Sequence, residues 1–196
     1  MEDPSQRLYF KQHFYFRIKD VDVFNLKAIY TMMHEWFVEE EFTKDEKDFP
    51  EVYMRDKITQ KNGREVLVFW RLHKHPAGVN FYNRTVDVII KIIGVKDIEV
   101  MQGGKKFKIQ KGIFEVKAYG YLEYDVEHKW RDHWLLKNFL DFYVNRMTKK
   151  DMESHRNELM VEMQSFQRAV KDFLNLIKYD DKQFNLKNVG GLESTY

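Results

Sequence analysis

The chain has 196 residues and no cysteine, which excludes disulfides, thiolate catalysis, and cysteine-based zinc or iron–sulfur sites. Its 33 Lys and Arg residues nearly balance its 31 Asp and Glu residues, which argues against a long-range attraction to nucleic acid or anionic membranes. Aromatic residues make up 16% of the chain, and this favours extensive packing or contact surfaces over disorder. We expect one domain over residues 1–179 and a polar tail over residues 180–196.

The N-terminal sequence MEDPSQRLYF has neither the basic start nor the apolar stretch of a secretory signal. The longest apolar run is VDVIIKIIGV, which is far shorter than the ~20 residues of a membrane-spanning helix and contains Asp87 and Lys91. We therefore expect a cytoplasmic protein without a membrane span.

The first predicted element is a strand over residues 8–18, where apolar and amphipathic side chains alternate. A helix follows, with Asp20 or Asp22 as its N-cap and an end near Glu39. Its apolar residues recur at helical spacing: Phe24, Leu26, Ile29, Tyr30, Met33 and Phe37.

Two further strands, over residues 51–59 and 64–73, are predicted to form a hairpin around Asn62-Gly63. Residues 84–126 then read as a meander of the runs RTVDVIIKII, VKDIEVM and KKFKIQKGIFEVKAYGYLEYDV. Gly103-Gly104 separates the second run from the third, and Lys111-Gly112 marks a kink.

The hydrophobic period changes from two to about 3.6 after Asp125. We expect a helix over residues 130–147 and a second one that starts at Thr148, with Asp151 close to the position of a capping box. The second helix carries one apolar stripe over about 30 residues. The stripe consists of Met152, His155, Leu159, Met163, Phe166, Val170, Phe173 and Ile177.

These elements predict an α+β fold. It comprises an antiparallel sheet of about six or seven strands, an N-terminal helix and a long C-terminal helix pair. Over residues 8–179, the order of the elements resembles the helix-grip layout of START-like domains. That resemblance implies a curved sheet around the last helix and an apolar ligand cavity, although the helix at 130–147 departs from the pattern. The segment KGIFEVKAYGYLEYDVEHKW also resembles uncharacterised proteins of small-genome archaea.

Candidate chemical motifs are weak. His73 and His75 lie two residues apart, but a metal site would need a further ligand such as Glu65. Gly103-Gly104-Lys105-Lys106 lacks the full spacing of a phosphate-binding loop. We therefore predict no catalytic residue, no metal site and no cofactor, and we do not favour nucleic-acid binding.

One set of side chains projects opposite the predicted core of the sheet, and large apolar patches of this kind mark contact sites. The alternative is that the last helices cover this face. The predicted interface, with residues of the tail added, comprises Tyr9, Tyr15, Leu67, Phe69, Ile89, Tyr119, Tyr121, Phe184, Leu186 and Leu192.

Two functional hypotheses follow from this pattern. The first is a non-enzymatic assembly protein that forms a homo-oligomer through this face, with the tail as an arm to a neighbouring subunit. The second is a helix-grip carrier that binds a small apolar ligand between the sheet and the long helix.

Overall fold

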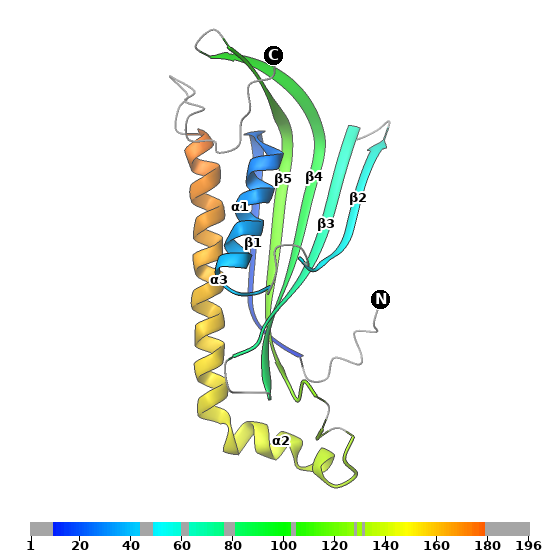
Figure 1. The fold of residues 1–196 in the computed structure, drawn as a ribbon, viewed down its shortest axis with the longest axis vertical. Coiled ribbons are helices and arrows are strands. Elements are labelled where there is room, and N and C mark those ends of the chain that lie inside the picture. Colours follow the sequence, from blue (N-terminus) through cyan, green and yellow to red (C-terminus); the bar gives the residue numbers. More distant parts are fainter. Residues whose placement is uncertain are drawn as a thin grey trace.

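The computed structural model describes residues 10–43, 49–59, 63–76, 81–102, 105–127, 129–130 and 132–178. The strands are β1 (Phe10–Phe24), β2 (Glu51–Thr59), β3 (Gly63–Lys74), β4 (Tyr82–Gln102) and β5 (Lys105–Tyr124). They form one antiparallel sheet in the order β1-β5-β4-β3-β2, with the helices α1 (Leu26–Glu39) and α3 (Lys149–Lys178) beside it (Figure 1). The α+β class with an antiparallel sheet and a long last helix is thus confirmed.

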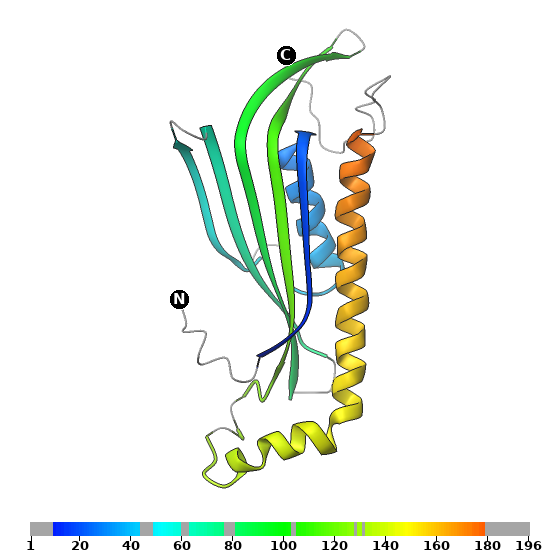
Figure 2. The ribbon, with the colours of Figure 1, turned by 180° about the vertical axis from the view of Figure 1, so that it is seen from behind.

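The sheet of the described residues has five strands, not six or seven. The predicted runs RTVDVIIKII and VKDIEVM belong to the single strand β4. Gly94, at a φ of 69°, bends this strand, and the pairing with β5 shifts between Ile93 and Lys96. A Cβ on Gly112 would lie 3.0 Å from the Ile93 carbonyl oxygen, so the neighbouring strand comes close at this point. The two glycines therefore bend the hairpin without ending its strands, and the far ends of β4 and β5 curl over (Figures 1 and 2).

Strand β1 is longer than predicted, and the helix cap is a different residue. The strand continues through Asp20 and Asp22, which were the predicted caps, as far as Phe24. Asn25 caps α1 instead, because its Oδ1 atom accepts a hydrogen bond of 3.2 Å from the Ala28 amide. The acidic run that follows ends the helix at Glu39, as expected.

Both long helices pack on one face of the sheet, and the core lies between them. The even-numbered residues of positions 66–72 in β3 and 84–92 in β4 point into it, among them Trp70, Val88 and Ile90, all at most 1% exposed. The stripe of α3 supplies Leu159, Met163, Phe166, Val170 and Leu174. A Cβ added at Gly120 of β5 would lie 3.4 Å from Met163 and 3.5 Å from Leu159, which is ordinary van der Waals contact, so α3 packs directly on this strand.

The segment predicted as a helix over residues 130–147 is irregular. It contains a 3₁₀ turn (Leu136–Asn138), the short helix α2 (Leu140–Phe142) and a π-helical turn (Tyr143–Met147). Residues 132–147 are called the connector below, and they extend from the start of α3 past the end of the sheet (Figure 1). Helix α3 begins just after Thr148, as predicted, but the Thr148 hydroxyl donates back to the Val144 carbonyl at 3.4 Å.

Truncation of Phe166 should destabilise the protein far more than truncation of Phe173. The Phe166 ring is fully buried against Phe16, Trp36 and Phe37, whereas Phe173, which belongs to the same apolar stripe, is only partly buried. We expect Phe166→Ala to lower the free energy of unfolding by about 3–5 kcal/mol and Phe173→Ala by about 1–2 kcal/mol. Urea unfolding followed by circular dichroism measures both, and equal losses would contradict this placement.

Candidate interaction surfaces

The face of the sheet opposite the helices is called the outer face. Neither α1 nor α3 covers it (Figure 2). The strand register fixes which side chains share it, because residues that pair across antiparallel strands point to the same side. One row runs Tyr53, Phe69, Ile89, Lys117 and Arg17. The next row contains Arg71, Asp87, Tyr119 and Tyr15.

The centre of the outer face is aromatic. The Tyr15 and Tyr119 rings lie 4.9 Å apart, and the Tyr119 and Tyr121 rings stack at 6.5 Å. Across the sheet, the Arg71 guanidinium lies 5.5 Å from the centre of the Phe69 ring. Tyr15 and Tyr53 keep 46% and 43% of their surface exposed, while the other rings are partly buried by their neighbours. The result is a preformed set of rings whose rotamers are already restricted by packing.

The structure thus brings six of the ten predicted interface residues onto one surface: Tyr15, Leu67, Phe69, Ile89, Tyr119 and Tyr121. Tyr9, Phe184, Leu186 and Leu192 lie outside the described residues, as does the whole predicted tail.

Ion pairs hold the acidic side chains of the outer face. Arg71 binds the Asp87 carboxylate with both ends of its guanidinium, at 2.8 and 3.0 Å. Glu115 accepts from Arg17 at 2.9 Å and from Lys117 at 3.2 Å. Burial raises the pKa of Glu115, but the hydrogen bonds from Arg17 and Lys117 outweigh it and leave this pKa below its usual value.

The charge on this face is predominantly positive. Between the rows of Glu65 and His73, seven basic residues share the face with three acidic ones. The basic residues are Arg17, Lys19, Arg55, Lys57, Arg71, Lys91 and Lys117, and the acidic ones are Glu65, Asp87 and Glu115. The balanced composition of the whole chain conceals this local excess.

The connector forms a second exposed apolar surface, which the sequence pattern does not indicate. Its large exposed side chains are Trp134, Leu135, Phe139, Phe142 and Met147, with exposures from 44% to 75%. Buried Leu140 and Val144 attach it to the body, together with the Tyr143 ring, which stacks on Trp130 at 4.4 Å. Eight of the eleven residues from 134 to 144 are apolar or aromatic, so no single helical stripe indicates which side chains turn outward.

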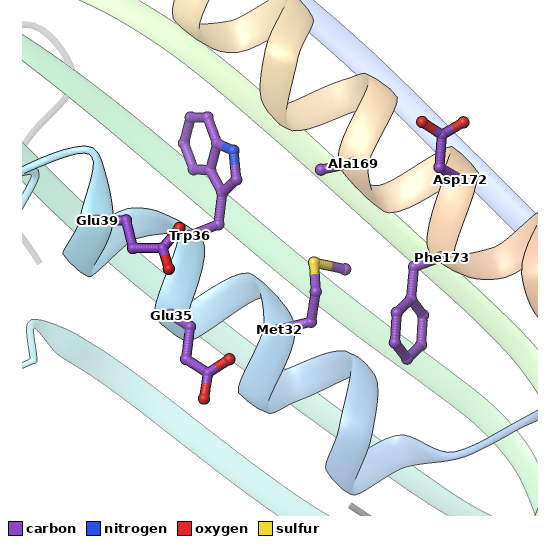
Figure 3. A pocket seen from close by; sticks show the side chains of 7 residues that line it. All are labelled: Met32, Glu35, Trp36, Glu39, Ala169, Asp172 and Phe173. Atoms are coloured by element: carbon purple, nitrogen blue, oxygen red, sulfur yellow. The ribbon is translucent and has the colours of Figure 1, made fainter. Parts of the chain in front are cut away.

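A groove of about 290 Å³ lies between α1 and α3, on the helical side of the molecule. Met32, Trp36, Ala169 and Phe173 supply its apolar lining, and Glu35, Glu39 and Asp172 also line it (Figure 3). None of the described residues that line it is basic.

A buried ionic cluster fixes α3 to the ends of β3 and β4. Arg84 is 6% exposed and pairs with Glu158 and Glu162, both at 3.0 Å. Lys74 binds the same Glu162 oxygen at 2.8 Å. The sequence held a signal for this cluster, because Arg84 occupies a core position of β4 and the two glutamates flank the apolar stripe of α3 one turn apart.

The side chain of His73 contacts polar neighbours on β4 and does not form the metal site that its spacing with His75 suggested. Its Nδ1 atom lies 3.0 Å from the Thr85 hydroxyl and 3.2 Å from the Asn83 amide nitrogen. Burial, followed by the charge of Arg71, lowers the pKa of His73. Within the described part of the chain, no group of three His, Asp or Glu residues is arranged to hold a metal ion.

The buried cluster should contribute more to stability than an exposed ion pair of the same type. We expect Arg84→Met to lower the free energy of unfolding by about 3 kcal/mol, because it leaves Glu162 buried with one cationic partner fewer. The matched control is Arg64→Met, which breaks the exposed pair of Arg64 with Asp56 and should cost less than about 1 kcal/mol. Urea unfolding of the two variants measures the difference.

The lowered pKa of Glu115 predicts an acid-sensitive contribution to stability. The contribution is present above the usual pKa of 4.5 and is lost as the pH falls through the lower pKa of the folded state. The difference in unfolding free energy between the wild type and Glu115→Gln should therefore shrink from about pH 7 to about pH 3. A difference that stayed constant over this range would contradict the ion pairing.

Comparison with models of known protein families, with curated proteins and with solved structures finds no match to this chain. Among the helices of the described residues, none is both long and apolar enough to cross a membrane. The function has to be inferred from the outer face, the connector and the groove.

Proposed function

We propose that the chain is a non-enzymatic assembly protein that self-associates through its outer face. The observation that carries this proposal is the cluster of partly exposed Tyr15, Tyr119 and Tyr121 rings on a sheet face that neither α1 nor α3 covers. Tyrosine is favoured at interfaces because it offers a large apolar ring together with a polar tip and loses little conformational entropy on binding.

The existing packing of these rings supports association. The Tyr15–Tyr119 contact and the Arg71–Phe69 contact are already formed in the single chain, so a partner does not have to order them. The bidentate Arg71–Asp87 pair fixes the neighbouring row in the same way.

The positive charge of the outer face determines how such an interface responds to salt. Two copies that meet through this face bring like charges together, and added salt screens the repulsion. The apolar and aromatic contacts remain in high salt, so self-association should strengthen as the ionic strength rises. A polyanion such as nucleic acid would respond in the opposite way, because salt weakens its binding to Lys and Arg.

The tight packing of side chains between the sheet and α3 favours the assembly hypothesis over the carrier hypothesis. Phe16, Val116 and Phe166 meet there and are at most 4% exposed. An apolar ligand between the sheet and the long helix would have to displace these side chains.

We expect the wild-type protein to sediment as an oligomer. The part of its self-association that the outer-face variant Tyr15→Lys/Phe69→Lys lacks should strengthen as NaCl is raised from about 0.05 M to about 0.5 M. The outer-face variant Tyr15→Lys/Phe69→Lys should self-associate more weakly than the wild type at both salt concentrations, because it removes two rings and adds two positive charges. Val161→Lys, at an exposed position of α3, is the matched control and should behave like the wild type.

A wild-type protein that stays monomeric in both salts would refute the proposal. Binding of a single-stranded oligonucleotide that weakens with salt would assign the outer face to nucleic acid. Co-purification of an apolar ligand with a monomer would favour the carrier hypothesis.

A further inference from the structure

Residues 137–150, which run from the connector into the first turn of α3, combine exposed apolar and basic side chains. Phe139, Phe142 and Met147 are 53%, 59% and 70% exposed. Residues 137–150 contain four basic residues, Lys137, Arg146, Lys149 and Lys150, against the single acidic residue Asp141. All four basic side chains are exposed.

The groove between α1 and α3 has the complementary chemistry. Its lining offers aromatic and aliphatic surface from Trp36, Met32 and Phe173, and three exposed carboxylates surround it. Figure 3 shows the apolar side chains reaching into the gap between the two helices, with Glu35 and Glu39 beside them. Grooves between helices receive the apolar face of short helical segments in many protein complexes.

The two surfaces of one chain cannot meet each other. The connector joins α3 at Lys149, whereas the groove lies around Ala169, twenty residues along the same helix. At a rise of 1.5 Å per residue, about 30 Å of rigid helix separates them. Figures 1 and 2 both show the connector at the opposite end of α3 from the carboxyl-terminal turns.

We propose that the connector of one copy docks into the α1–α3 groove of a second copy. The charges then complement each other: the basic side chains of residues 137–150 face Glu35, Glu39 and Asp172 of the neighbour. Because the contact joins two different surfaces, two copies either exchange both contacts in a two-fold dimer or continue head to tail into a ring or a filament. This contact is distinct from the outer face and should weaken with salt, since its charges attract.

The test uses the outer-face variant Tyr15→Lys/Phe69→Lys as the parent, so that the result does not depend on the proposed function. A groove variant adds Glu35→Lys/Glu39→Lys to it, and a connector variant adds Phe142→Ser/Met147→Ser. Thermal unfolding by circular dichroism confirms that each variant folds. Sedimentation velocity at about 100 μM and low salt gives the mass of each variant alone and of the two mixed.

We expect the parent to form dimers or larger oligomers, and each added variant alone to be monomeric. Mixed together, the two should form a 1:1 complex and nothing larger, because only one intact connector and one intact groove remain. The affinity of that complex should fall at least roughly tenfold between low salt and about 0.5 M NaCl.

A monomeric parent would overturn the inference whether or not the wild type associates. So would self-association of the groove variant alone, since the connector would then bind elsewhere. Binding of the parent to anionic lipid vesicles that is lost in the connector variant and kept in the groove variant would assign the connector to a lipid surface instead.

Discussion

The position of α3 on the sheet is the constraint on which the rest of the molecule depends. Its apolar stripe contacts β1 and β5, and Leu159 and Met163 pack over Gly120 of β5. Apolar packing alone does not fix the position of α3 along the sheet. The ion pairs of Arg84 with Glu158 and Glu162 fix it, because they join specific residues of β4 and α3. Helix, sheet and register are thereby fixed together.

Three surfaces result from this one arrangement. Since α1 and α3 share a side, neither covers the outer face with its tyrosine rings. Because α1 is much shorter than α3 and packs beside it, a groove remains between them, with Trp36 and Phe173 in its lining. And because α3 starts beyond the sheet's end, the connector that leads into it projects past the body. An apolar surface that recurs in three places is more than folding of a single copy requires.

The charges separate these surfaces into two kinds. The outer face and residues 137–150 carry exposed Lys and Arg side chains, whereas the charged residues in the described lining of the groove are all carboxylates. A nearly neutral chain can therefore present like charges in one contact and opposite charges in another. Salt acts on the two contacts in opposite directions, so the ionic strength would select which assembly dominates.

The sequence by itself determined the element types and the core side of each strand, because periods of two and about 3.6 are local properties of the chain. It predicted the stripe of α3 from Leu159 to Val170 and placed Phe69 and Tyr119 on one face, since alternation along a strand is independent of the strand's neighbours. It overcounted the strands because Gly94 looks like a strand end, and only pairing with the adjacent strand shows that this glycine bends one continuous strand.

Only the tertiary structure decided which surfaces remain open. Helices α1 and α3 could have packed on opposite sides of the sheet with the same sequence periodicity. They share one side because Phe166 of α3 packs against Trp36 and Phe37 of α1. The sequence also did not predict which connector side chains are exposed, because the apolar residues of the connector do not form one stripe. Leu140 is buried and Phe142 is exposed because of where the body of the protein lies. The groove joins residues more than 130 positions apart, and no local pattern relates Trp36 to Phe173.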